Sequence, residues 1–164
     1  MQDGHIQILN RVDEQDLLRA RIESKRAEFL VVYGRRRVGK TELLSHLASH
    51  HRSFYFEATE TVSAHHKADL TAELASVSND PVLAVQTLES WPAVLAAIER
   101  YVSDQPTLVV LDEFQYLAKQ SPELETTLSR WWRTKGRHLP ITLVVAGSEI
   151  AFFEDEILAG QQYG

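Results

Sequence analysis

The feature that most constrains the fold of this chain is a glycine-rich loop that follows a short apolar run. Residues 29–41 read FLVVYGRRRVGKT, which matches the phosphate-loop (Walker A) pattern G-x-x-x-x-G-K-[ST] between a strand and a helix. The glycines let the backbone curl so that successive N–H groups point at phosphate oxygens. In such a loop, Lys40 reaches the β- and γ-phosphates and the Thr41 hydroxyl ligates Mg²⁺. The residues predicted to line a bound nucleoside triphosphate are Gly34, Arg35, Arg36, Arg37, Val38, Gly39, Lys40, Thr41 and Glu42.

The size and composition suit one soluble domain over residues 1–164. A chain of 164 residues is long enough to bury a sizeable core. Its composition, 44% hydrophobic and 24% charged residues, is ordinary for a soluble globular protein. There is no cysteine, no long apolar run and no signal-peptide pattern, so we expect a cytoplasmic protein without a membrane span. The net charge is −6 and no basic run occurs beyond residues 35–37, which argues against strong nucleic-acid binding by this segment.

Apolar runs and helical patterns alternate along the chain. Strands are predicted over residues 29–33, 54–56, 107–111 and 141–146. Helices are predicted over residues 13–25, 41–50, 63–77 and 92–102, and from Ser121 to about residue 136. Strands that alternate with helices form a parallel sheet with right-handed crossovers. The sequence therefore predicts an α/β fold, a parallel sheet flanked by helices.

Acidic and polar residues follow two of the predicted strands. The segment LVVLDEFQYL, residues 108–117, places Asp112 and Glu113 at the end of an apolar strand (a Walker B pattern). In phosphate-loop ATPases an acid in this place holds Mg²⁺ through water, opposite Thr41, and the adjacent glutamate is the usual candidate to orient and polarise the attacking water. The alternative is that the two acids form a solvated turn. Because ligands bind at the carboxyl ends of parallel strands, we expect Ser148 to reach the γ-phosphate or the water; the alternative is a plain turn.

Two pairs of side chains carry a weaker functional signal. His46 and His50 lie four residues apart on a predicted helix, a spacing that can bind zinc. No third ligand accompanies them, so we favour a surface role. Trp131 and Trp132 follow helical spacing from Leu128, and we favour the core over base stacking for at least one of them.

Several segments together carry a family resemblance that spans roughly residues 8–164. They read ILNRVDEQDLLRARI, VVYGRRRVGKTELL, YFEAT, LVVLDEFQYL, LSRWWR and VVAGSEI. The chain resembles the archaeal-type ATPase family, which is related to the signalling (STAND) and AAA+ ATPases and also occurs in bacteria. The phosphate loop with its three arginines is the most specific part of the resemblance.

The resemblance implies a P-loop ATPase core of the additional-strand, catalytic-glutamate type. Its ligands are ATP or ADP, with Mg²⁺ as the metal. On the matching positions of this sequence, the catalytic residues are Lys40, Glu113 and Ser148. The implied metal-binding residues are Thr41 and Asp112.

Two parts of the implied nucleotide site stay open. The resemblance places Asn10 and Arg11 near the base and ribose, but a plain surface role for them carries equal weight. An arginine finger, which contributes about 10³–10⁵-fold to phosphoryl transfer, is not identified. Residues 35–37 either contact phosphate or a neighbouring subunit, or they are solvated loop residues. We expect slow or absent turnover by the 164-residue chain alone.

The sequence ends earlier than the family pattern does. In such families the core continues into a further helix, a fifth strand, a helical lid and often a C-terminal domain, whereas this sequence stops at ILAGQQYG. We therefore expect a core truncated after the sensor strand, with an exposed edge on the phosphate-loop strand.

The leading functional prediction is a Mg²⁺-dependent ATPase. Its hydrolysis of ATP would drive a conformational change in the missing domain or in a protein partner, and oligomerisation is left open. One alternative is a nucleotide-binding switch or scaffold with little hydrolysis. The other is a DNA-directed, AAA+-like ATPase that contacts nucleic acid only through missing regions.

Overall fold

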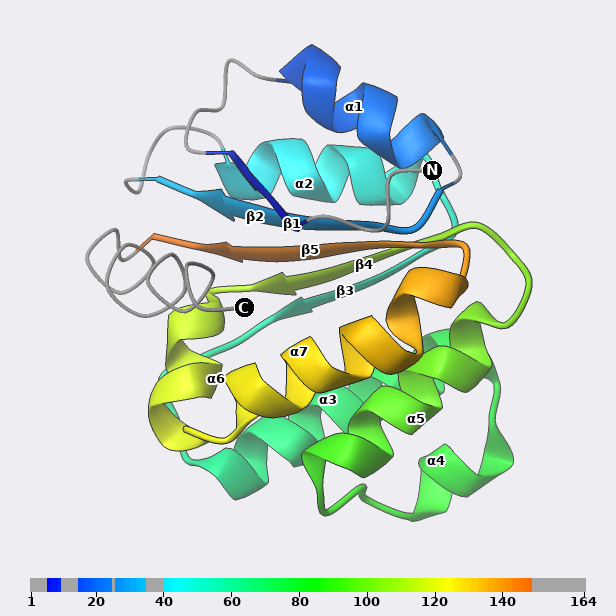
Figure 1. The fold of residues 1–164 in the computed structure, drawn as a ribbon. Coiled ribbons are helices and arrows are strands. Elements are labelled where there is room, and N and C mark those ends of the chain that lie inside the picture. The colour runs from blue at the N-terminus through cyan, green and yellow to red at the C-terminus, as the bar shows by residue number, and fades with distance from the viewer. Residues whose placement is uncertain (1–5, 10–14, 25, 35–39, 149–164) are drawn as a thin grey trace.

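The chain folds into a parallel sheet with helices on both faces (Figure 1). The computed structural model describes residues 6–9, 15–24, 26–34 and 40–148. The strands are β1 (Ile6–Leu9), β2 (Glu28–Tyr33), β3 (Ser53–Glu57), β4 (Thr107–Asp112) and β5 (Ile141–Gly147). They lie in the order β1-β2-β5-β4-β3, and every neighbouring pair is parallel. The predicted α/β fold is confirmed.

Helices connect the strands and cover the sheet. They are α1 (Gln15–Glu23), α2 (Lys40–Ser49), α3 (Ser63–Ser78), α4 (Pro81–Val85), α5 (Trp91–Val102), α6 (Phe114–Gln120) and α7 (Leu124–Thr134), with a 3₁₀ helix, η2 (Gly136–His138). Within the described ranges, none of them has both the length and the apolar character needed to cross a membrane.

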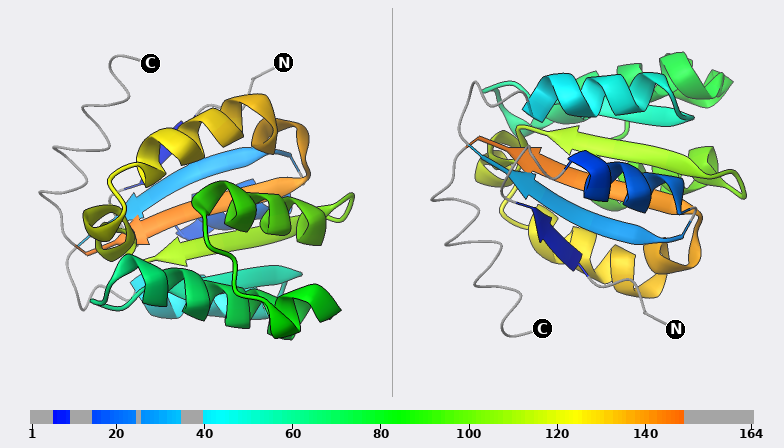
Figure 2. Two further views of the ribbon diagram at one scale, coloured as in Figure 1. Left: turned by 90° about the horizontal axis from the view of Figure 1, so that it is seen from below. Right: turned by 90° about the horizontal axis from the view of Figure 1, so that it is seen from above.

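Side chains alternate between the two faces of the sheet, and each face has its own core. On one face, Leu30, Val110 and Val144 pack against the apolar sides of α1 and α2. The other face lies against α3, α5, α6 and α7, which Figure 1 shows below the sheet and the left view of Figure 2 shows from below. Because β2, β4 and β5 are buried at every position, their sequences are nearly continuous apolar runs. This burial explains why these strands are predictable.

The short strand β1 corrects two expectations. The sequence predicts no strand before residue 29, and it predicts an exposed edge on β2. In the structure, β1 pairs with β2, with Ile6 opposite Phe29 and Leu9 opposite Val32. Four residues give too short a pattern to stand out in a sequence. The phosphate-loop strand β2 is therefore flanked on both sides, by β1 and β5.

Local capping explains where the helix α5 begins. Ser90 caps α5, since its hydroxyl accepts a hydrogen bond from the Ala93 N–H at 3.2 Å. The predicted helix start at Ser121 is wrong, because Ser121 is the C-cap of α6 and α7 begins at Leu124. The Ser121 side chain is buried and its hydroxyl lies 2.8 Å from the Ser63 hydroxyl. The sequence also predicts neither α4 nor α6.

Trp131 and Trp132 both lie in the core, as favoured from their spacing. The Trp132 ring meets Phe29 edge-on, with ring centroids 5.4 Å apart. Gly136 follows in η2, where a Cβ would lie 2.6 Å from Trp132 Cε3 and 2.7 Å from Trp131 Cζ3. Glycine is therefore required there so that the chain can turn against the two indole rings.

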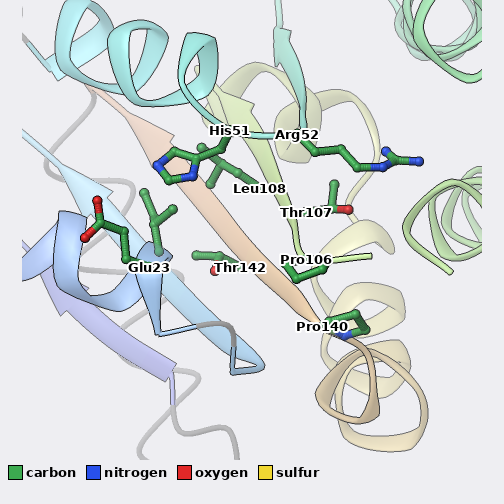
Figure 3. Close-up of a pocket in the computed structure, with 9 residues that line it drawn as sticks. Glu23, His51, Arg52, Pro106, Thr107, Leu108, Pro140 and Thr142 are labelled. Atoms are coloured by element: carbon green, nitrogen blue, oxygen red, sulfur yellow. The ribbon is translucent and has the colours of Figure 1, made fainter. Parts of the chain in front are cut away.

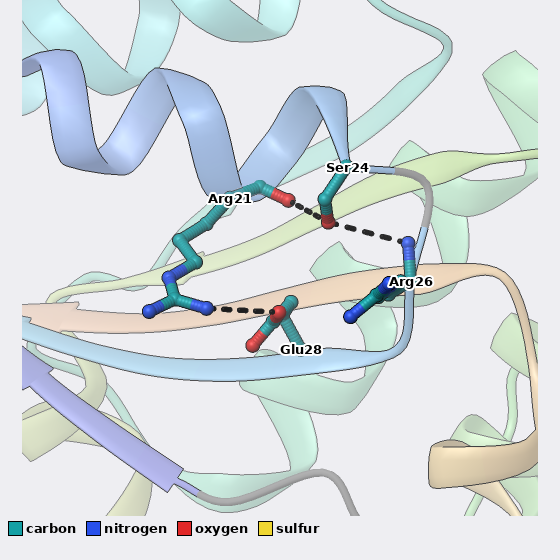
Figure 4. A network of polar contacts seen from close by, with 4 residues as sticks. All are labelled: Arg21, Ser24, Arg26 and Glu28. Carbon is teal, nitrogen blue, oxygen red and sulfur yellow. Dashed lines mark hydrogen bonds and ion pairs between the residues drawn. The ribbon is translucent and has the colours of Figure 1, made fainter. Parts of the chain in front are cut away.

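The turn from α1 into β2 is held by local polar contacts (Figure 4). The Ser24 hydroxyl donates to the Arg21 carbonyl at 2.7 Å and accepts from the Arg26 N–H at 3.3 Å. Arg21 Nη1 forms an ion pair with Glu28 Oε1 at 3.5 Å. These contacts lie at the edge of the sheet where the strands begin.

Candidate functional site

Three strands end side by side at the opposite, carboxyl edge of the sheet. Gly34 directly follows β2, and its N–H donates to the Gly147 carbonyl at the end of β5, 3.2 Å away. Asp112 is the last residue of β4, and Ser148 directly follows β5. The strand ends are neighbours because β5 lies between β2 and β4. Sheet order thus brings together the phosphate-loop strand, the acidic strand and Ser148.

Asp112 is fully buried and accepts hydrogen bonds from two other elements. Its Oδ2 accepts from the Thr41 hydroxyl on α2 at 3.0 Å and from the Tyr55 hydroxyl on β3 at 2.5 Å. Its Oδ1 accepts from the Glu113 N–H at 2.8 Å. The bond to Thr41 joins residues 71 positions apart. A buried carboxylate needs such donors, since desolvation otherwise disfavours its charge.

Tyr55 is a site residue that sequence reasoning missed. Phe54 and Phe56 face the core on one side of the sheet, and Tyr55 faces the side of α2 and Asp112. Burial raises the pKa of Tyr55 well above its usual range, and the hydrogen bond and charge of Asp112 raise it further. The tyrosine therefore stays protonated and donates to the carboxylate. Its signal in the sequence is the one hydroxyl in the aromatic run of residues 54–56.

Glu113 begins the turn from β4 into α6. Its backbone has φ 54° and ψ 43°, the left-handed region that non-glycine residues seldom adopt. Its Oε2 accepts from the Ser148 hydroxyl at 2.9 Å and also from the Gln115 amide. The predicted water-activating group and the predicted sensor are thus in direct contact.

Gln115 is the second residue that sequence reasoning missed. It is fully buried, and its Nε2 contacts both Glu113 Oε2 and the Ser148 hydroxyl, the latter at 3.5 Å. Its Oε1 has no hydrogen-bond partner among the described residues. The sequence feature that could have pointed to Gln115 is a polar amide in the otherwise apolar start of α6, two positions after Glu113.

Several predicted nucleotide-binding residues lie outside the described part of the structure. They are Asn10, Arg11, Arg35, Arg36, Arg37, Val38 and Gly39. Lys40 is the first residue of α2, but its side chain also lies outside the described part. Glu42 is exposed in the first turn of α2. The roles predicted for these residues stay predictions.

No group of three or more His, Asp and Glu side chains within the described residues could hold a metal ion by itself. His46 and His50 are exposed on α2, with ring centroids 4.5 Å apart. His50 Nδ1 lies 2.9 Å from the His46 carbonyl oxygen, a local contact within the helix. The pair accordingly lies on the surface, as favoured from the sequence.

The pocket in Figure 3 lies at the amino edge of the sheet, away from Asp112. It has a volume of about 160 Å³ between the end of α1 and the starts of β4 and β5. Arg52 lines it, but this guanidinium already donates to the Tyr101 carbonyl at 2.7 Å and to Gln105 Oε1 at 3.1 Å. The pocket is therefore separate from the polar site at the carboxyl edge.

Two solved structures have a similar fold: one is described as a Walker-type ATPase, and the other was solved with nucleotides bound. The chain superposes on the Walker-type ATPase PABY2304 of Pyrococcus abyssi with a TM-score of 0.63 and 17% identity, over 90% of this chain and 47% of that one. It superposes on the ORC2 protein of Aeropyrum pernix, solved as ADPNP–ADP complexes, with a TM-score of 0.63 and 19% identity, over 98% and 48% of the two chains. These likenesses show that the fold is that of P-loop ATPases.

Sequence comparison identifies the family. An uncharacterized protein of Methanocaldococcus jannaschii, MJECL04, is 28% identical over 160 residues, which is 92% of this chain and 32% of that protein. The chain thus spans about a third of this curated relative and about half of the two solved structures. A family model described as an ATPase domain predominantly from Archaea matches residues 8–162. The resemblance stated from the sequence is confirmed, and the chain belongs to this family of ATPase domains.

Proposed function

We propose that this chain is the core of a Mg²⁺-dependent ATPase that binds ATP at residues 34–42 and hydrolyses it with a water activated by Glu113. The observation that carries the proposal is the 3.0 Å hydrogen bond between Thr41 and Asp112. It joins the last residue of the phosphate-loop motif to the acid at the end of β4. This is the pairing that a phosphate loop and its metal-holding acid require.

The donor set at this point fits Mg²⁺. Thr41 and Asp112 offer a hydroxyl and a carboxylate, the hard oxygen ligands that Mg²⁺ prefers. Mg²⁺ at nucleotide sites is usually held by one or two protein groups together with phosphates, so a cage of three protein ligands is not needed. When bound here, the ion would neutralise charge on the β- and γ-phosphates.

The contacts of Glu113 suggest how the chain controls the attacking water. The Ser148 hydroxyl carries one proton, which it donates to Glu113 in the structure. A γ-phosphate oxygen near Ser148 would compete for that proton and release one carboxylate oxygen. Glu113 could then orient and polarise the water. Lys40, from the motif, would bind the β- and γ-phosphates.

We further propose that hydrolysis changes contacts with a protein partner or with protein beyond this core. The lengths of the relatives support this, because the matched region is 32% of the curated relative and 47–48% of the solved chains. ATP-dependent assembly of several copies is one form that such a change could take.

A second candidate, a nucleotide-binding switch with little hydrolysis, is favoured by one observation. Glu113 Oε2 accepts from both Ser148 and Gln115, and Ser148 also approaches Oε1 at 3.3 Å. A carboxylate held in this way is poorly placed to take a proton from water. If nucleotide does not displace these partners, ATP would shift a conformational equilibrium without rapid turnover.

Glu113→Gln in the full-length protein separates the two candidates. We expect ATP binding to persist and turnover to fall by roughly 10²–10⁴-fold, since glutamine cannot accept the proton. Glu123→Gln, an exposed acid just before α7, is the matched control and should turn over like the wild type. Unchanged turnover in Glu113→Gln contradicts the ATPase mechanism. Negligible wild-type turnover with ATP-dependent assembly favours the switch, and absence of ATP binding overturns both.

A further inference from the structure

We propose that Tyr55 is a positioning residue that holds the Asp112 carboxylate in place for the nucleotide-bound Mg²⁺. The inference rests on the proposed function and extends it to β3, a strand that carries none of the site residues proposed above. Tyr55 is two residues before the end of β3, and its hydroxyl reaches diagonally across to the end of β4.

The hydrogen bonds of Asp112 show why a further donor matters. Oδ1 is held by the backbone N–H of Glu113 at 2.8 Å, which leaves Oδ2 to face Thr41. The Thr41 hydroxyl gives its one proton to Oδ2, so its lone pairs stay available to a metal ion. Tyr55 contacts the same Oδ2 at 2.5 Å, the shorter of the two side-chain contacts. It thereby fixes the orientation of the carboxylate toward Thr41.

The chemistry of Tyr55 suits an indirect role. Its hydroxyl donates to a carboxylate and therefore points its proton, not a lone pair, at Asp112 Oδ2, the oxygen on the Thr41 side that would face Mg²⁺. Tyr55 lies on a strand, β3, that is paired with β4 over its whole length, and a paired strand supports a side chain more firmly than a loop does. Residues that hydrogen-bond metal ligands orient them, and their loss typically weakens metal affinity by about 10–100-fold.

A purely structural role would give a different result. If Tyr55 only filled space beside α2, its hydroxyl would be dispensable for metal binding. If it satisfied Asp112 only for folding, the loss would appear in stability and not in metal affinity at saturating nucleotide. Metal affinity in a folded variant is therefore the deciding measurement.

The test uses Tyr55→Phe in the full-length protein, with Mn²⁺ as a spectroscopic probe. Mn²⁺ binding is measured by electron paramagnetic resonance in the presence of a saturating, non-hydrolysable ATP analogue. We expect Tyr55→Phe to bind Mn²⁺ about 10–100-fold more weakly than the wild type. Affinity for the analogue in EDTA should be unchanged, which also shows that the variant is folded.

The matched control is Tyr101→Phe. The Tyr101 hydroxyl donates to the Ser53 carbonyl at 3.0 Å, at the other end of β3, so its loss removes a similar bond far from Asp112. We expect wild-type Mn²⁺ affinity. In an Asp112→Asn background, Tyr55→Phe should weaken Mn²⁺ binding no further, because the group that Tyr55 positions is absent.

The outcomes are distinct for the two proposals. Wild-type Mn²⁺ affinity in Tyr55→Phe, or an equal loss in the Asp112→Asn background, overturns the role of Tyr55. A wild type that binds the analogue without any dependence on metal overturns the Mg²⁺-dependent function instead. Should Tyr55→Phe not fold, proton NMR of the wild type decides: a slowly exchanging Tyr55 hydroxyl proton that is lost in Asp112→Asn supports the proposal, and its absence overturns it.

Discussion

The two edges of the sheet satisfy their polar groups in different ways. At the carboxyl edge, the side-chain donors to the buried Asp112 come from 71 and 57 positions away, from Thr41 and Tyr55. At the turn into β2 on the amino edge, Ser24 bonds to groups only three and two positions away. The first set of contacts joins three separate elements, α2, β3 and β4, whereas the second forms within one turn.

Burial adds to this contrast. Asp112 is fully buried, whereas the side chains of the Arg21–Glu28 ion pair are 31% and 12% exposed. Hydrogen bonds to a charged group contribute more than neutral ones, and ion pairs near solvent contribute little. We therefore expect substitutions at the carboxyl edge to have large effects and those at the amino edge small ones.

The largest effect is expected for Asp112→Asn. The amide lacks the charge and presents N–H donors to hydroxyls that also donate, so ATP hydrolysis by the full-length protein should fall by roughly 10²–10³-fold. Steady-state phosphate release measures this. Asp104→Asn, an exposed acid at the amino edge just before β4, is the control and should keep wild-type turnover. Similar losses of turnover in Asp112→Asn and Asp104→Asn would contradict the difference between the two edges.

Tyr55→Phe and Tyr101→Phe compare the edges through one kind of substitution. Removing the donor to the buried Asp112 should lower the free energy of unfolding by about 1.5–3 kcal/mol. Removing the Tyr101 donor to the Ser53 carbonyl should lower it by about 0.5–1.5 kcal/mol, because that bond joins neutral groups. Urea unfolding in metal-free buffer checks both values. Equal losses would mean that the charge of Asp112 adds nothing.

Alkaline pH gives a second test of the contribution of Tyr55 to stability. Burial, together with the bond to Asp112, raises the pKa of Tyr55 in the folded protein above its ordinary value of 10.0. Above pH 10 the unfolded chain therefore loses a proton that the folded protein keeps, and wild-type stability falls by up to about 1.4 kcal/mol per pH unit. Below pH 10 the contribution of this group to stability is present in full and does not change with pH. The stability advantage of the wild type over Tyr55→Phe should narrow as the pH rises above 10; a constant advantage argues against the raised pKa.

The smallest effect is expected for the Arg21–Glu28 pair. A double-mutant cycle with Arg21→Gln and Glu28→Gln should give a coupling energy below about 1 kcal/mol, and it should shrink with added salt. Thermal unfolding at two salt concentrations measures it. A coupling as large as that between Tyr55 and Asp112 would show that burial does not separate the two pairs.

The parts of the molecule that the sequence predicts are those with a strong local pattern. The apolar runs of β2, β4 and β5 and the phosphate-loop motif are visible without knowledge of the sheet. β1 is too short to stand out, and α6 begins after a left-handed residue, Glu113, that no pattern announces. Asp112 and Ser148 follow from the rule for strand ends. Tyr55 and Gln115 do not, because their partners depend on register between β3 and β4 and on the path of α6.

The strand order has a consequence for how the molecule is made. β5 is the last of the described strands along the chain, yet it lies between β2 and β4. During synthesis, β1 with β2 and β3 with β4 can form only as two separate sheet fragments until residues 141–147 have left the ribosome. Each fragment has an unpaired inner edge that favours association with other chains in the meantime. The polar site spans both fragments, so the nascent protein completes it only when β5 joins them.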